Sequence, residues 1–182
     1  FLAAPSCTHL PAPGLSTVSQ PIRIIAWGNM GRRDDGSALV LAERLAERYA
    51  GVSDVVVQEY HQLGPELVDD LHHCRLAIFV DAHAHEDGAD VTFGRLLPAQ
   101  TGGLDTHHCP PDVLLGLTAA MHLNVPEAWL VGIRGYDWDF GDILSERTRQ
   151  AMLEAEEKIV ALLDDALGKG STSSAGGQPA TS

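Results

Sequence analysis

The order of strand-like and helix-like segments constrains the fold of this chain most. Residues 22–27 read IRIIAW, a short apolar run that is typical of a buried strand. The next segment carries Leu39, Ala42 and Leu45 at the spacing of one helix face. Continued along the chain, this reading gives strands at residues 22–27, 54–60, 76–80, 90–96 and 128–133, and helices at residues 38–49, 65–72, 110–123 and 145–167.

Alternation of this kind predicts an α/β protein. We expect a three-layer α/β/α sandwich, with a mainly parallel, twisted sheet of about five strands and helices on both faces. The 182 residues suit a single domain, which we place at residues 21–167. Residues 1–20 are rich in Pro, Ser and Thr, and residues 168–182 are rich in Gly and Ser, so both are expected to be disordered tails.

Composition narrows the choice of partners and of compartment. The formal charge is −13, which argues against nucleic acid or an anionic membrane as a partner, because both require a basic surface. No apolar run approaches the ~20 residues of a membrane span, and the first residues lack the pattern of a secretion signal. The three cysteines form no CxxC pair, so we expect reduced thiols in a cytoplasmic protein.

Most of the chain's aspartate and histidine chemistry follows the ends of the predicted strands. In parallel sheets, ligands bind beyond the carboxyl ends of the strands, so residues there are expected to converge. Asp81 follows the run LAIFV directly, and a pair of histidines precedes the helix that begins near Pro110. The full set of candidates at this edge is Gly28, Asn29, Asp34, Asp35, His61, Gln62, Asp81, His107 and His108.

Two carboxylates and an imidazole at this edge could form a three-ligand site for a divalent cation. Asp34 and Asp35 both suit helix capping, but one aspartate is enough for that role and the other is free for function. A histidine beside a helix N-terminus is disfavoured as a cation, and the neutral imidazole is the metal-binding form. Oxygen and nitrogen ligands suit zinc, nickel or iron.

Two alternatives use neighbouring residues. In DAHAHED, Asp81, His83 and His85 recur at period two, so a longer strand would place all three on one face as a different metal site. A loop is the simpler interpretation, because HEDGAD has the composition of a turn. Cys109 could act as a thiol nucleophile beside the two histidines, although the prolines that follow it already indicate a structured turn.

Four segments, taken in order, resemble the nickel–iron hydrogenase maturation endopeptidases. These are AWGNMGRRDDG, LAIFVDA, THHCPPDVLLGL and WLVGI, which resemble the family's Gly-Asn loop with its acidic pair, its Asp-ending strand, its His-containing helix start and its last strand. The likeness covers roughly residues 22–165. One departure is the stretch EYHQLGPEL, which replaces the family's frequent Asp-Gly-Gly-Thr and gives His61 and Gln62 possible substrate roles.

The resemblance implies an endopeptidase that removes the C-terminal extension of a nickel–iron hydrogenase large-subunit precursor after nickel insertion. It implies Asp35, Asp81 and His107 as metal-binding and catalytic residues, with His108 as the alternative ligand. Nickel would be carried by the precursor. Water activated by the metal or by a carboxylate would attack the peptide bond.

The same resemblance bears on the substrate contacts. We expect contacts from Gly28, Asn29, Asp34, His61 and Gln62, with Asp34 also supporting the turn. A monomer is expected. The alternatives are a nickel-binding assembly protein on the same fold, without enzymatic activity, and a general α/β hydrolase or nucleoside-binding enzyme.

Overall fold

The computed structural model describes residues 20–85, 88–100 and 109–168, which form one five-stranded sheet in the order β2-β1-β3-β5-β4. Neighbouring strands are parallel except β4, which runs antiparallel to β5 at the edge. The mainly parallel sheet predicted from the sequence is confirmed. The strands are β1 (Ile22–Trp27), β2 (Val55–Tyr60), β3 (Leu76–His83), β4 (Val91–Leu96) and β5 (Glu127–Arg134).

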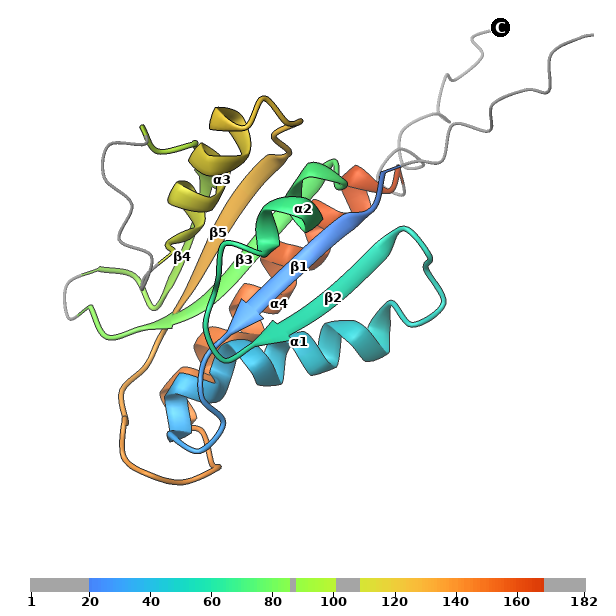
Figure 1. The fold of residues 1–182 in the computed structure, drawn as a ribbon. Helices are drawn as coiled ribbons and strands as arrows, with labels where there is room; N and C mark the ends of the chain where they lie inside the picture. Colours follow the sequence, from blue (N-terminus) through green and yellow to red (C-terminus); the bar gives the residue numbers. More distant parts are fainter. Residues whose placement is uncertain (1–19, 86–87, 101–108, 169–182) are drawn as a thin grey trace, which may run out of the picture.

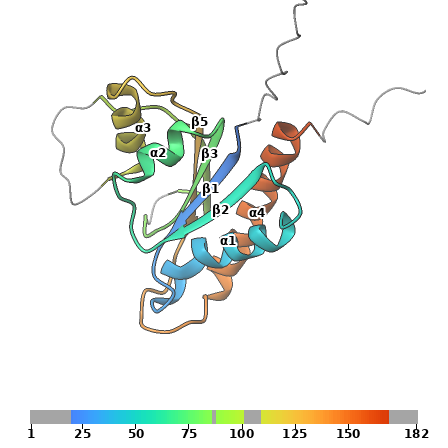
Figure 2. The same cartoon turned by 45° about the vertical axis from the view of Figure 1, so that its right-hand side comes forward.

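Helices cover both faces of the sheet, as predicted. Two longer helices, α1 (Ser37–Arg48) and α4 (Glu146–Ala166), lie on one face, and α2 (Leu67–His72) and α3 (Pro111–Ala120) lie on the other (Figures 1 and 2). A short 3-10 helix, η1 (Arg33–Gly36), joins the end of β1 to α1. The two predicted tails lie almost wholly outside the described residues, which begin at Gln20 and end at Gly168.

The sheet separates two apolar clusters, one beneath each helical layer. Along β1, Ile24 packs toward α1 and α4, whereas Ile25 packs toward α2 and α3, and Ile78 and Phe79 of β3 divide in the same way. All four of these side chains are fully buried. A strand that is covered on both faces carries mostly apolar residues, which explains these runs in the sequence. The exception in β1 is Arg23, whose guanidinium forms an ion pair with Asp70 at 2.9 Å. Within the described ranges, no helix is long and apolar enough to cross a membrane.

Strand β3 is three residues longer than the sequence predicted. The apolar run ends at Val80, but the ladder with β5 continues, and Asp81 and His83 pair in register with Gly132 and Arg134. Backbone pairing therefore carries the strand past the end of its hydrophobic sequence. The loop interpretation is wrong for residues 81–83. Asp81 lies inside β3, two residues before the end of the strand, rather than after it.

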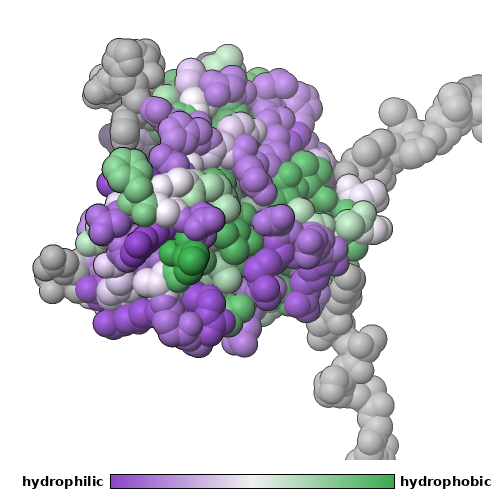
Figure 3. Space-filling model, turned by 90° about the horizontal axis from the view of Figure 1, so that it is seen from below, coloured by the Kyte–Doolittle hydropathy of each residue, from purple (hydrophilic) through white to green (hydrophobic). Residues whose placement is uncertain are grey.

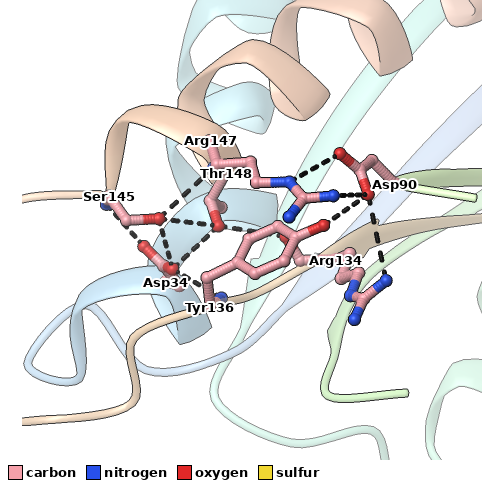
Figure 4. A network of polar contacts seen from close by, with 7 residues as sticks. All are labelled: Asp34, Asp90, Arg134, Tyr136, Ser145, Arg147 and Thr148. Atoms are coloured by element: carbon pink, nitrogen blue, oxygen red, sulfur yellow. Dashed lines mark hydrogen bonds and ion pairs between the residues drawn. The ribbon is translucent and has the colours of Figure 1, made fainter. Parts of the chain in front are cut away.

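A buried carboxylate fixes the connection between η1 and the segment that follows β5 (Figure 4). The side chain of Asp34 is fully buried and accepts hydrogen bonds from the backbone N–H groups of Tyr136, Asp137 and Ser145 at 2.8, 2.8 and 2.7 Å. The hydroxyls of Ser145 and Thr148 donate at 2.8 and 2.7 Å. Burial alone would raise the pKa of Asp34, but these hydrogen bonds outweigh it and hold the pKa below its usual value.

We expect Asp34→Asn to lower the free energy of unfolding by about 2–4 kcal/mol at pH 7, because an amide offers one acceptor oxygen and turns its NH₂ toward buried donors. Urea unfolding measures the loss. Asp34 has a lowered pKa in the folded protein, so its contribution is present above the unfolded pKa and is lost as pH falls through the folded value. The difference in free energy of unfolding between wild type and Asp34→Asn should therefore become smaller at acidic pH.

The neighbouring Asp35→Asn variant is the matched control for this experiment. Asp35 is only half-buried, and we expect its substitution to leave the free energy of unfolding at pH 7 within about 0.5 kcal/mol of wild type or slightly above it. Equal losses in the two variants would contradict the structural role assigned to Asp34.

Candidate functional site

Asp35 and Asp81 approach each other at the carboxyl edge of the sheet. Asp35 lies in η1, which follows β1 and packs against β3, and Asp81 lies near the end of β3, the strand beside β1. The negative charge of Asp35 is one cause of the raised pKa of Asp81. The two carboxylates predicted to share a site are therefore close enough to influence each other electrostatically.

The environment of Asp81 favours its neutral form in the metal-free protein. Burial is the main cause, and it raises the pKa of Asp81 from 3.8 to about 7. A hydrogen bond from the backbone of Ala82 acts in the opposite direction, and the charge of Asp35 adds to the rise. A cation placed between the two carboxylates would offset both the burial and the repulsion, so this arrangement suits a positively charged ligand.

A cavity of about 370 Å³ opens beside Asp81. Its walls come from the end of β1, the loop after β2, the tip of β3 and the segment that begins α3. His61 and Gln62 thus lie at the same cavity as Asp81, as expected of residues that follow neighbouring strands. The lining residues are Trp27, His61, Gln62, Leu63, Asp81, Cys109, Pro110 and Pro111.

Gly28 and Asn29 shape the loop that carries Asp35. Gly28 has φ of +152°, and a Cβ atom there would lie 2.1 Å from the backbone oxygen of Asp35. The N–H of Asn29 donates to that same oxygen at 3.3 Å, while its side-chain oxygen accepts from the N–H of Gly31 at 2.9 Å. The observed role of both residues is to bring the backbone of Asp35 close to the end of β1. Their contacts with substrate stay a prediction.

The predicted histidine ligands, His107 and His108, lie outside the described residues. The next residue, Cys109, is buried and lines the cavity beside Asp81, together with the prolines that begin α3. The chain therefore arrives at the cavity immediately after the histidine pair. The choice between His107 and His108 stays open.

The alternative site at Asp81, His83 and His85 is only partly assembled. Asp81 and His83 share one face of β3, and the rings of His83 and His85 are 5.2 Å apart. Nevertheless, within residues 20–85, 88–100 and 109–168, no group of three His, Cys, Asp or Glu side chains is placed to hold a metal ion. The described part of the chain thus gives this alternative no support, and the histidine predicted for the first site lies outside that part.

The position of Asp34 favours its structural role over a contact with substrate. Its side chain is fully buried, and its oxygens already receive five hydrogen bonds from the segment after β5. Asp35, one residue later in η1, is half-buried, and its negative charge contributes to the raised pKa of Asp81. The acidic pair is therefore divided between one residue that holds the loop and one that is available for a ligand.

Sequence reasoning missed Trp27 as part of the site. Trp27 lines the cavity, and its ring meets the ring of Phe79 edge-on at a centroid distance of 6.4 Å. The alternation of side chains along β1 could have identified it. Trp27 follows Ile25 by two residues and so lies on the same face of the sheet, toward α2 and α3. Trp27 therefore adds an apolar surface to a cavity that polar side chains also line.

No family model matches the chain, and no curated protein sequence matches it significantly. Solved structures do. The hydrogenase maturating endopeptidase HybD from E. coli is 20% identical, with a TM-score of 0.68 over 80% of this chain and 93% of its own. The [NiFe] hydrogenase maturation protease HycI from Thermococcus kodakarensis KOD1 is 19% identical, with a TM-score of 0.60 over 81% of this chain and 95% of its own.

A third example is the [NiFe] hydrogenase maturation protease HybD from Thermococcus kodakarensis, which is 19% identical, with a TM-score of 0.59 over 78% of this chain and 98% of its own. Each alignment spans nearly the whole length of the solved protein. At this identity the likeness concerns the arrangement of the backbone. The chain therefore has the fold of the hydrogenase maturation endopeptidases.

Proposed function

We propose that this protein is an endopeptidase that removes the C-terminal extension of a nickel–iron hydrogenase large-subunit precursor. The observation that carries the proposal is the approach of Asp35 and Asp81 beside a cavity that Cys109 also lines. Similarity to solved hydrogenase maturation proteases supports the reaction class. The proposed compartment is the cytoplasm, and the proposed working unit is a monomer.

In this proposal, nickel belongs to the substrate. Asp35, Asp81 and His107 would engage the nickel of the precursor, and the nickel would report that metal insertion is complete. Asp81 suits this role, because a buried carboxylate with a pKa of about 7 gains most when a cation arrives. The anchored nickel would hold the precursor's C-terminal segment in place, and fixed placement of the scissile bond supplies much of the rate advantage.

The cavity accommodates the peptide on either side of the bond to be cut. Trp27 and Leu63 offer apolar surface, and His61 and Gln62 are exposed at its mouth. Water activated by the metal, or by a carboxylate of the pair that does not hold the nickel, would attack the peptide bond. Exposed polar groups beside an apolar wall suit an extended peptide segment.

The first test is processing of nickel-loaded precursor by the purified chain, followed by mass spectrometry of the large subunit. We expect the wild type to cleave the precursor once. Asp81→Asn should process it at least roughly 100-fold more slowly, because the variant loses a charged contact that positions the bond. Asp165→Asn, in an exposed position of α4, is the matched control and should process normally.

Two other outcomes have definite meanings. If the wild type binds the precursor without shortening it, the protein is not a protease, and the alternative of a nickel-binding assembly protein is supported. Full processing by Asp81→Asn would remove Asp81 from the site and contradict the proposed mechanism.

The two adjacent histidines can be separated by substitution. We expect His107→Ala to abolish processing and nickel-dependent binding of the precursor, whereas His108→Ala should retain both within about threefold, because only one imidazole is needed as the third ligand. Calorimetric titration with nickel-loaded and metal-free precursor gives the second readout. The reverse pattern would assign the ligand to His108.

The raised pKa of Asp81 predicts a pH dependence of stability in the metal-free protein. A carboxyl whose folded pKa lies above its unfolded value contributes stability below the unfolded pKa, and that contribution is lost as pH rises through the folded value. With the pKa moving from 3.8 to about 7, the loss falls between about pH 4 and pH 8.

Asp81→Asn should remove this dependence. At pH 8 the variant is expected to be more stable than wild type by up to roughly 4 kcal/mol, from about 1.4 kcal/mol per pKa unit, and near pH 4 the difference should shrink toward zero. Chemical unfolding across this range measures it. Equal stability at pH 8 would mean that Asp81 is not held in an unfavourable charged state, and the same data show whether the processing variant is folded.

A further inference from the structure

The loop after β5 exposes two large apolar side chains at the carboxyl edge of the sheet. Phe140 is 86% exposed and Ile143 is 77% exposed. Seen from this edge, the surface carries hydrophobic residues set among hydrophilic ones (Figure 3). Leu97 and Met121 are comparably exposed, but they follow β4 and α3 and so lie at the opposite end of the sheet. Large exposed apolar side chains beside a functional edge mark a contact surface.

This surface is held in shape from beneath. The N–H of Arg33 donates to the carbonyl of Gly141 at 2.8 Å, and the N–H of Gly141 donates to the carbonyl of Gly31 at 3.0 Å. An ion pair joins the side chains of Arg33 and Asp137. The buried Asp34 holds both ends of the loop, so the backbone that carries the exposed Phe140 and Ile143 is restrained.

A cavity of about 270 Å³ lies beside Ile143 and carries a spare negative charge. Its walls include Asp137, Asp142, Ile143 and Leu144. Asp137 is already paired with Arg33, but the exposed carboxylate of Asp142 has no hydrogen bond or ion pair with any residue in the described part of the chain. A cavity with an aliphatic wall and a free carboxylate fits the stem and the charged head of a lysine or arginine.

The charges around Phe140 also bear on which kind of side chain would bind there. Arg32 lies beneath Phe140, with its guanidinium carbon 5.8 Å from the ring centroid, and leaves the rest of the ring exposed. Asp139 adds a second exposed carboxylate on the same loop, and it too lacks a side-chain partner among the described residues. The whole chain carries a formal charge of −13, which attracts basic partners from a distance.

We propose that Phe140, Ile143 and Asp142 form a docking surface for a segment of the hydrogenase precursor in which an apolar side chain and a lysine or arginine lie close together. The apolar side chain covers Phe140 and Ile143, and the cation faces Asp142. This inference rests on the proposed function, because it names the same substrate. Arg33 and Asp34 connect the surface directly to Asp35, so docking there orients the precursor toward the site.

The experiment measures binding and cleavage separately. Affinity is measured with metal-free precursor, which the proposed enzyme does not cut, and kcat and KM are measured with nickel-loaded precursor, with Asp81 unchanged in every chain. We expect Phe140→Ser with Ile143→Ser to weaken binding at least tenfold and to raise KM similarly, with kcat within about twofold, because the change removes apolar contact remote from the reacting bond.

Asp142→Asn should weaken binding roughly threefold at low salt and less at high salt, because exposed charge pairs are weak and screened. The matched control is Leu97→Ser with Met121→Ser, which removes comparably exposed apolar residues at the far end of the sheet and should change neither binding nor KM. Circular dichroism confirms that each variant is folded.

The outcomes distinguish the two proposals. Normal cleavage by wild type together with wild-type affinity in the Phe140 and Ile143 variant overturns the docking surface and leaves the protease intact. Binding that depends on this surface, without cleavage by wild type, supports the docking surface and overturns the protease. Absence of any binding and of any cleavage of nickel-loaded precursor by the wild-type chain overturns both.

Discussion

The buried carboxylate of Asp34 is the interaction on which the arrangement of the carboxyl edge depends. A charge removed from water is costly unless hydrogen bonds replace its solvation, and five donors from one segment do so here. Those donors cannot be satisfied by another group without moving the loop. The carboxylate thereby fixes the loop after β5 relative to η1, although the two are about a hundred residues apart in sequence.

The same loop is also held by Asp90, which lies just before β4, the strand at the edge of the sheet (Figure 4). Its carboxylate accepts a hydrogen bond from the hydroxyl of Tyr136 and two from Arg147 at 3.1 and 3.2 Å. The guanidinium groups of Arg134 and Arg147 flank the Tyr136 ring, with their carbons 4.9 and 4.2 Å from its centroid. Two aspartates from distant elements thus restrain one loop, and this explains how it can present apolar side chains to solvent.

The fold was predictable from the sequence because local periodicity and burial agree. IRIIAW and LAIFV are mostly apolar because β1 and β3 are covered on both faces, and the one charged residue, Arg23, forms an ion pair with Asp70. The side chain of Ser145 caps α4 by accepting from the N–H of Thr148. The end of β3 was not predictable, since pairing with Gly132 and Arg134 is a tertiary effect that leaves no hydrophobic signal. The partners of Asp34 were equally hidden, because they belong to a segment far along the chain.

The site shows why adjacent aspartates can differ in role. In the tight turn of η1, consecutive side chains point in different directions, so Asp34 enters the protein while Asp35 stays near the surface. Donors surround the first and hold its pKa down, whereas the second adds its charge to the burial that raises the pKa of Asp81. One carboxylate is thus fully compensated by the protein, and the pair formed by Asp35 and Asp81 is not. A site with excess negative charge beside a cavity favours a cation as its ligand, and this agrees with the proposal that the metal arrives with the substrate.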